Sequence, residues 1–246
     1  MRIALMSDIH ANREAFEACL RDVRERGADR LVFLGDYVGY GADPSWVVHK
    51  VMELVTGGAL AVMGNHDHAV SYPGEELNND AEVAMSWTRG QLGSEARKFL
   101  SDLPMRFEED MRLYVHANVQ TGRRWHYVDS PEAAGRALES CSAQTVFCGH
   151  LHVPTLYGIT ATGKTASFRP VSGVAVPLPQ HRRWLVVLGA VGQPRDGNPA
   201  ASYTLLDTDR REATYMRVPY DVEAAAAKIR AAGLPDRLAE RLEVGS

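Results

Sequence analysis

The chain begins with Arg2-Ile3-Ala4-Leu5-Met6, an apolar run that leads directly into Ser7-Asp8-Ile9-His10. A short apolar run bounded by polar residues is typical of a buried strand. Asn12 is suited to cap a following helix, in which apolar residues recur with helical spacing as far as Arg26, and Gly27 supplies the stop. The opening stretch therefore predicts a strand and a helix, joined by a turn that carries Asp8 and His10.

The same alternation continues through the first half of the chain. Leu31–Leu34 and Leu60–Met63 are further apolar runs, and a helix is expected between them from about Ser45 to Leu54. Continuous apolar strands that alternate with helices indicate a parallel sheet covered by those helices. Further helical stretches are expected at about 79–90 and 94–100.

The second half is richer in strands. They are expected at 113–115, 145–148, 154–159, 166–168, 183–188, 202–207 and 213–217. Helices are expected from the cap Ser130 to Glu139, and from the cap Asp221 to Ala232, where Gly233-Leu234-Pro235 ends the pattern. No repeat or linker divides the chain, so we expect one α/β domain over 1–246. Its expected architecture is a two-sheet sandwich, with mixed sheets flanked by helices.

Composition places the chain among ordinary globular proteins. It has 246 residues, of which 45% are apolar and 24% charged, and its formal net charge is −4. These values argue against disorder and against binding nucleic acid by bulk charge. The N-terminal apolar run is too short for a signal-peptide core, and no run approaches the about 20 apolar residues that span a bilayer. Three cysteines fit neither a disulfide framework nor a thiolate zinc site, so a cytoplasmic protein without a membrane segment is expected.

Histidine, aspartate and asparagine gather after the predicted strands. Five predicted buried strands are each followed by one such segment. The segments are Asp8-Ile9-His10, Gly35-Asp36, Gly64-Asn65-His66-Asp67, His116, and Gly149-His150-Leu151-His152. Because the carboxyl ends of parallel strands meet at one edge of a sheet, we expect these side chains to converge on one site.

The donor set at these strand ends predicts a metal centre. The candidate ligands are Asp8, His10, Asp36, Asn65, His116, His150 and His152. They offer only nitrogen and oxygen, which favours ions such as Mn²⁺, Fe²⁺, Ni²⁺ or Zn²⁺ over a structural zinc. The set is too large for one ion and large enough for two if one carboxylate bridges. Two ions about 3.5–4 Å apart are a recurring arrangement for phosphoester hydrolysis.

The five segments, in this order, resemble the signature of the calcineurin-like metallophosphoesterase superfamily. That signature reads Asp-x-His, Gly-Asp, Gly-Asn-His-Asp/Glu, His and Gly-His-x-His. The loop from Gly35 to Pro44 and the later Val191-Gly192-Gln193-Pro194-Arg195 look like its small bacterial and archaeal phosphodiesterase branch, related to diadenosine tetraphosphatases. The resemblance implies the two-sheet fold and a phosphate-ester substrate.

The resemblance also implies a role for each residue. Asp8, His10, Asp36 and His152 would hold one divalent ion, and Asp36, Asn65, His116 and His150 the second, with Asp36 as the bridge. Mn or Fe is favoured, with Zn, Ni or Co as alternatives. A hydroxide between the ions would attack phosphorus, while His66 protonates the leaving oxygen and Asp67 orients His66.

Departures from the family pattern concern substrate binding. The family's small phosphodiesterases have an Arg soon after the fourth-block histidine, whereas this chain reads His116-Ala117-Asn118-Val119-Gln120. Arg123, Arg124 or Arg195 would have to replace that phosphate contact. His126 and Tyr37 are further substrate-binding candidates. The plainer alternatives are a surface ion pair for Arg195 and packing on the glycine-rich loop for Tyr37.

The expected function is thus that of a dinuclear metal-dependent phosphohydrolase acting on a small phosphodiester or nucleotide-type substrate. Hydrolysis of a dinucleoside polyphosphate or of a phosphomonoester is the alternative within the enzyme class. A non-catalytic scaffold of the same fold is the alternative outside it, and it is disfavoured because no ligand or catalytic His is lost. The oligomeric state is left open.

Overall fold

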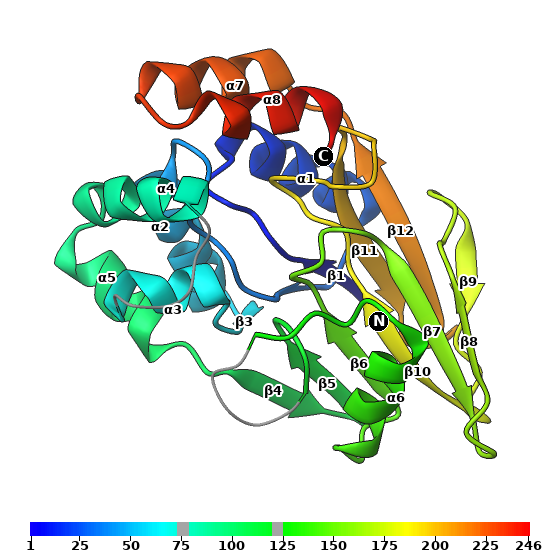
Figure 1. Cartoon of the computed structure of the whole chain (residues 1–246). Helices are drawn as coiled ribbons and strands as arrows, with labels where there is room; N and C mark the ends of the chain where they lie inside the picture. Colours follow the sequence, from blue (N-terminus) through cyan, green and yellow to red (C-terminus); the bar gives the residue numbers. More distant parts are fainter. Residues whose placement is uncertain (73–78, 120–124) are drawn as a thin grey trace.

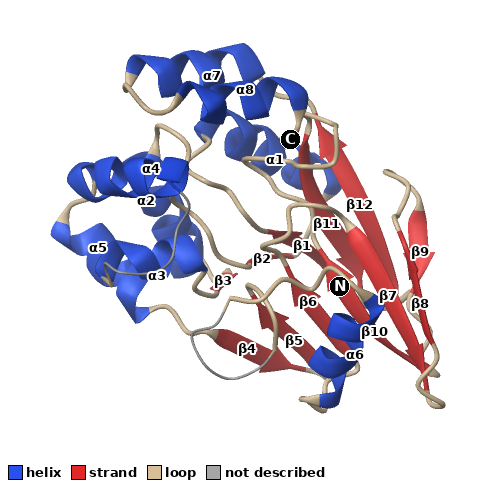
Figure 2. Cartoon of the chain, viewed as in Figure 1, coloured by secondary structure: helices blue, strands red, loops and turns tan. Residues whose placement is uncertain are grey.

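The strands of the computed structural model form two six-stranded sheets, and the residues described are 1–72, 79–119 and 125–246 (Figures 1 and 2). The first sheet has the order β3 (Leu60–Ala61), β2 (Arg30–Phe33), β1 (Arg2–Met6), β11 (Ala201–Asp207), β12 (Glu212–Val218), β9 (Ala175–Pro177). The second has the order β4 (Arg106–Glu109), β5 (Arg112–Val115), β6 (Thr145–Cys148), β10 (Arg182–Val187), β7 (Thr155–Thr160), β8 (Thr165–Phe168).

Both sheets are mixed, as predicted. Strands β1, β2 and β3 run parallel, with Leu5 paired to Val32, whereas β11 is antiparallel to β1. In the second sheet β5, β6 and β10 are parallel and β7 is antiparallel to β10. The parallel strands therefore present their carboxyl ends along one edge of each sheet.

Helices cover the outer faces of the sandwich. They are α1 (Arg13–Arg26), α2 (Pro44–Thr56), α3 (Asn65–Ser71), α4 (Asn79–Gln91), α5 (Ser94–Asp102), α6 (Pro131–Glu139), α7 (Val222–Ala231) and α8 (Asp236–Val244). Figure 1 shows α6 beside β10 and the other helices on the side of the first sheet. The predicted caps are present: Asn12 accepts the N–H of Ala15 at 3.1 Å, and Gly27 ends α1 with φ of 67°.

The core between the sheets explains the continuous apolar character of β1. Ile3 and Leu5 point between the sheets, where they meet Tyr114 and Phe147 of the second sheet. Ala4 and Met6 point the other way and pack under the helices. Since successive side chains of a strand alternate between faces, both faces of β1 must be apolar.

Three parts of the fold differ from the expected one. The chain continues past Pro235 into α8, whose Leu238 and Leu242 are buried against α7. The segment after β3 forms the short helix α3, which was not predicted, and β3 is only two residues long. Strands β4 and β9 were not predicted, because both are short and carry exposed residues without an apolar run.

Within the described ranges no helix combines the length and the apolar composition that crossing a membrane requires.

Candidate metal centre

The candidate ligands meet at the carboxyl ends of the parallel strands. Asp8 and His10 follow β1, Asp36 follows β2, Asn65 opens α3 after β3, His116 follows β5, and His150 and His152 follow β6. All of these side chains are buried except Asn65, which is half-buried. Both sheets therefore contribute to one site, as the order of the strands predicts.

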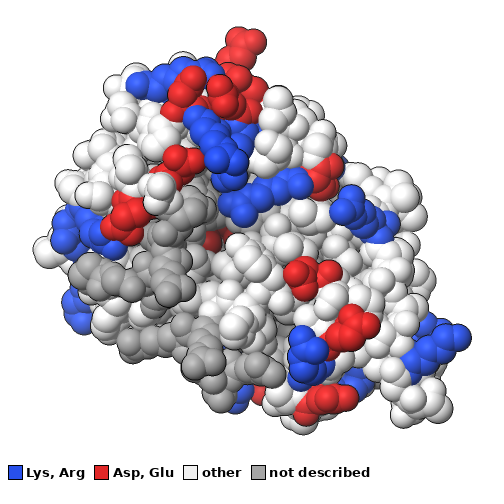
Figure 3. Space-filling view, in the orientation of Figure 1, with Lys and Arg blue, Asp and Glu red and all other residues white. Residues whose placement is uncertain are grey.

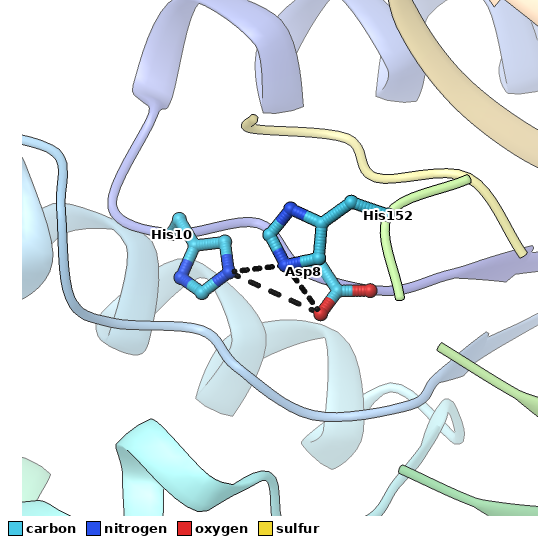
Figure 4. Close-up of side chains that lie close together, drawn as sticks. All are labelled: Asp8, His10 and His152. Atoms are coloured by element: carbon cyan, nitrogen blue, oxygen red, sulfur yellow. Dashed lines mark hydrogen bonds and ion pairs between the residues drawn. The ribbon is translucent and has the colours of Figure 1, made fainter. Parts of the chain in front are cut away.

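The first cluster consists of Asp8, His10 and His152, whose ligand atoms lie within 4.8 Å of one another. Nε2 of His10 is 3.1 Å from Nε2 of His152. Asp8 Oδ1 is 3.3 Å from Nε2 of His152 and 3.9 Å from Nε2 of His10. In Figure 4 the two imidazoles point toward each other and toward the carboxylate.

The second cluster consists of Asp36, His116 and His150. Nε2 of His116 lies 3.3 Å from Asp36 Oδ2, 3.2 Å from Nδ1 of His150 and 3.1 Å from Oδ1 of Asn65. These four side chains thus turn oxygen and nitrogen atoms toward one point.

Asp36 belongs to both sides of the centre. Its Oδ2 is 3.7 Å from Nε2 of His10 and 3.3 Å from Nε2 of His116. Its other oxygen, Oδ1, accepts the backbone N–H of His66 at 2.9 Å. Asp36 therefore lies between the clusters, in the position that a bridging carboxylate needs.

Hydrogen bonds to backbone carbonyls fix the tautomer of each histidine. Nδ1 of His10 lies 3.1 Å from the carbonyl oxygen of Val38, and Nδ1 of His116 lies 2.7 Å from that of Leu34. Nδ1 of His152 lies 2.6 Å from the carbonyl oxygen of Gln193, and Nε2 of His150 lies 3.0 Å from that of Trp125. A carbonyl oxygen only accepts, so each of these nitrogens carries the proton. The remaining nitrogen of each ring then faces the centre, where it offers a lone pair whenever the ring is uncharged. Such second contacts orient histidine ligands of metals, and the residues present therefore fit divalent ions.

The charges of the centre also suit a cation. Burial by itself would raise the pKa of Asp8, but the nearby His152 holds it below the ordinary value, and His116 does the same for Asp36. Burial lowers the pKa of His150 to about 3. His116 is the exception: burial would lower its pKa, but Asp36 raises it to about 9. Two ionised carboxylates thus share a buried space with mostly uncharged imidazoles.

The backbone is strained where these side chains are presented. Asp8, His10, Asp36, His150 and His152 have φ of 55°, 47°, 55°, 66° and 62°. Positive φ is uncommon for residues with a side chain and costs roughly 1–2 kcal/mol each. Strain of this kind gathers at functional sites, where the surrounding structure holds it in place.

His66 lies beside both clusters. Its ring centroid is 4.9 Å from that of His10, and it forms a third group with His10 and Asp36. Nδ1 of His66 is buried without a hydrogen-bond partner and faces Gly39, where a Cβ would overlap it. Gly39 has φ of 85°, so both its conformation and its lack of a side chain make room for the imidazole.

Asp67 does not contact the His66 ring in the way that the sequence predicted. Its Oδ2 accepts the backbone N–H groups of Asp36 at 2.8 Å and Gly64 at 2.9 Å, and its Oδ1 accepts that of Tyr37 at 2.9 Å. Burial and the charge of Asp36 raise the pKa of Asp67 to about 7. Asp67 thus joins the loop after β2 to the start of α3 and positions His66 only through the backbone.

The predicted substrate-binding residues are dispersed. Tyr37 is fully buried, and its hydroxyl donates to the carbonyl of Val62 at 2.8 Å, so packing on the loop is the correct alternative for it. His126 is exposed beside Trp125. Arg195 lies at the rim of the centre, with its Cζ 5.6 Å from the centroid of the Tyr40 ring. Arg123 and Arg124 lie outside the described residues.

Two aromatic residues at the centre were not among the predicted site residues. The centroid of the Tyr40 ring lies 4.5 Å from that of the His10 ring and 4.6 Å from that of the His66 ring. The Tyr127 ring stacks on His150 at 4.3 Å, with an angle of 12° between the planes. Their places in the sequence, inside the glycine-rich loop and in the aromatic run 125–127, were the available signals.

Comparison with known proteins identifies the family. Residues 1–211 match the model of the calcineurin-like phosphoesterase superfamily domain. The chain therefore belongs to the calcineurin-like phosphoesterase superfamily, which confirms the resemblance carried by the five segments.

Relatives extend this likeness over the whole chain. The chain is 34% identical over 251 residues to an uncharacterized protein of Methanocaldococcus jannaschii, covering 99% of this chain and 98% of that protein. A crystal structure of a metallophosphoesterase from Sphaerobacter thermophilus is 34% identical, with a TM-score of 0.88 and coverage of 100% of both chains. A hypothetical protein from Pyrococcus horikoshii shares the fold, with 18% identity, a TM-score of 0.79, and coverage of 100% of this chain and 98% of that one.

Proposed function

We propose that the chain is a dinuclear metal-dependent phosphohydrolase that cleaves phosphodiester or nucleotide-type bonds of a small-molecule substrate. The observation that supports this most is the pair of histidine lone pairs that His10 and His152 turn toward each other. Buried lone pairs that face each other repel, and the carboxylate of Asp8 lies beside them. In the other cluster His116 and His150 meet beside Asp36, whose charge holds on His116 a proton that a cation would displace. A cation relieves both the repulsion and the buried negative charge.

The proposed ligands divide between two ions. Asp8, His10, Asp36 and His152 would hold the first, and Asp36, Asn65, His116 and His150 the second. Two divalent ions supply Lewis-acid polarisation of a phosphoryl oxygen and lower the pKa of water. Mn or Fe is the proposed metal, with Zn, Ni or Co as alternatives, since the donors are nitrogen and oxygen alone.

His66 is the residue proposed to move a proton. Because Nδ1 faces Gly39, we assign the transfer to Nε2, which would donate to the leaving oxygen of the ester. In the free protein burial lowers the pKa of His66. An anionic ester beside the ring would raise that pKa again, so His66 would gain its proton as the substrate binds.

The test is hydrolysis of bis-p-nitrophenyl phosphate by the full chain with Mn²⁺, Fe²⁺, Zn²⁺, Ni²⁺ or Co²⁺. His66→Gln should lower kcat by about 10²–10⁴-fold without loss of bound metal, because it removes the proton donor alone. His181→Gln is the matched control, since His181 is exposed and directly precedes β10, at the opposite end of the parallel strands from the ligands. No turnover with any of these ions, or full activity in His66→Gln, would overturn the proposal.

Metal content separates the enzyme from the scaffold alternative. Two equivalents per chain after reconstitution are expected. Fewer than one equivalent would favour a non-catalytic scaffold of this fold.

A further inference from the structure

Two arginines at the rim of the metal centre lack a carboxylate partner. They are Arg195, in the loop between β10 and β11, and Arg241 of α8. Across the described parts of the chain neither forms an ion pair, and Nε of Arg195 is buried without a hydrogen-bond partner. The side chain of Arg195 donates to the neutral amide oxygen of Gln193, at 2.9 Å, and also contacts the side chain of Tyr40. The adjacent acid, Asp196, is bound by Arg217 instead.

Backbone contacts hold the end of α8 against the loop that carries Arg195. The N–H of Gly197 donates to the carbonyl of Gly245 at 2.8 Å. A Cβ on Gly245 would lie 2.6 Å from the carbonyl carbon of Asn198, so the helix end and the loop touch directly. Arg241 lies one turn before Gly245, and its carbonyl accepts the Gly245 N–H at 2.8 Å.

Tyr40 connects this pair to the metal centre. One side of its ring meets His10 and His66, and Arg195 lies over the ring at 5.6 Å. Tyr40 also packs in the apolar cluster that contains Leu242, the neighbour of Arg241 on α8. The guanidinium group of Arg195 is therefore one aromatic ring away from the proposed ligands, and Arg241 lies near enough for Tyr40 and Arg195 to act on its charge.

The positive charges at this rim repel one another. Burial lowers the pKa of Arg241 first, and the charges of Arg195 and Arg237 lower it further, against smaller opposite effects of Tyr40 and Asp80. Figure 3 shows basic side chains along the upper border of a hollow in the middle of this face, beneath the position of α7 and α8. Gathered cations attract anions and bind them through charge-assisted hydrogen bonds.

We propose that Arg195 and Arg241 form a second anion-binding subsite, which takes a second negatively charged group of the substrate. This rests on the proposed function, in which the metal centre holds the scissile phosphate. The substrate is then a phosphate ester with a further phosphoryl or carboxylate group, in contrast to a simple diester. Arg241 lies beyond residues 1–211 of the family match, so the C-terminal helices contribute specificity that this match does not describe.

Three substrates that share the same leaving group test the subsite. They are 4-nitrophenyl phosphodiesters whose second ester group is methyl, carboxymethyl or phosphonomethyl. Arg195→Gln and Arg241→Gln should lower kcat/KM on a charged substrate by about 10- to 100-fold, the range for lost charge-assisted hydrogen bonds, and Arg241→Gln should leave the methyl ester nearly unchanged. Arg241→Lys should recover part of the loss. If the arginine variants lose kcat/KM only on the phosphonomethyl ester, the subsite binds a phosphoryl group. If they lose it equally on the carboxymethyl ester, the subsite also accepts a carboxylate.

Arg237→Gln is the matched control, because Arg237 lies on the same helix, is exposed and has Asp80 within 3.9 Å. Equal losses on all three esters, or no loss with the variants folded by circular dichroism, would overturn the subsite.

A binding experiment separates this subsite from the proposed function. Inorganic pyrophosphate is titrated calorimetrically into the full chain after treatment with a chelator. Wild type and Arg237→Gln should bind it about 10-fold more tightly than Arg195→Gln or Arg241→Gln. Arginine-dependent binding without turnover would refute the phosphohydrolase and retain the anion subsite. Normal turnover with arginine-independent binding and no preference among the esters would refute the subsite alone.

Discussion

Nε2 of His10 and Nε2 of His152 face each other at 3.1 Å, although 142 positions separate the two residues along the chain. Each ring donates its other N–H to a backbone carbonyl, so no proton is available between the two facing nitrogens. The protein therefore holds two lone pairs together in a buried space. Metal ions should accordingly have a large effect on its stability.

Binding of Mn²⁺ should raise the thermal unfolding midpoint. An ion that binds only the folded state adds about 2.7 kcal/mol of unfolding free energy when its concentration is about 100 times Kd. Scanning calorimetry with Mn²⁺ and with a chelator measures the difference. His152→Ala should shrink the shift, while His181→Ala should keep it. An identical midpoint with metal and with chelator would contradict this expectation.

Gly39→Ala should displace His66. The new Cβ would overlap Nδ1 of His66 and would sit on a residue with φ of 85°. A shift of about 1 Å in a catalytic group can cost about 100-fold in rate, so a loss of that order is expected with metal content retained. Gly163→Ala is the control, because its φ is 79° and nothing lies within 4 Å of the added atom. It should lose about 1–2 kcal/mol of stability and no activity.

Asp67→Asn should destabilise the fold. The amide would turn its NH₂ group toward N–H donors from which a carboxylate oxygen now accepts, either that of Tyr37 or those of Gly64 and Asp36. A buried donor without an acceptor costs about 1–3 kcal/mol, which urea unfolding would detect. Asp110→Asn, at an exposed ion pair with Arg112, should change stability by less than about 1 kcal/mol. An unchanged free energy of unfolding in Asp67→Asn would mean that these hydrogen bonds to the backbone contribute little to stability.

Tyr203→Phe should reveal an acid-sensitive contribution to stability. Its hydroxyl donates to Oδ2 of Asp22 at 2.6 Å. Burial opposes ionisation of Asp22, but the hydrogen bonds from Arg26 and Tyr203 lower its pKa below the ordinary value. A lowered carboxyl pKa stabilises the fold above the unfolded-state pKa, and this contribution is lost as the pH falls through the folded-state pKa. The substitution should therefore cost about 1 kcal/mol at neutral pH and progressively less in acid, by urea unfolding. A cost independent of pH would point to packing alone.

Local signals in the sequence were enough for most of the first half of the fold. The apolar run of β1 and the cap at Asn12 act over a few residues, and neither depends on distant contacts. The convergence of the strand-end residues could also be predicted from the sequence, because the carboxyl ends of parallel strands meet at one edge of the sheet.

Features that depend on distant packing were missed. The apolar positions of α8 become a buried face only once α7 lies against them, and Arg241 approaches Arg195 only through that packing. The sequence also placed the Asp67 carboxylate against His66, whereas backbone amides from two loops bind it. Tyr37 was predicted near the substrate because its loop is there, but its side chain turns into the core.

The division of each cluster between the two sheets has a consequence for how the protein matures. His150 and His152 are the last proposed ligands to leave the ribosome, and each completes a different cluster. A nascent chain that stops before residue 150 has neither full set, however well its first strands have folded. The ion would therefore be acquired late, after the two halves of the chain have docked, and a stalled or truncated product would compete poorly with the finished protein for scarce metal.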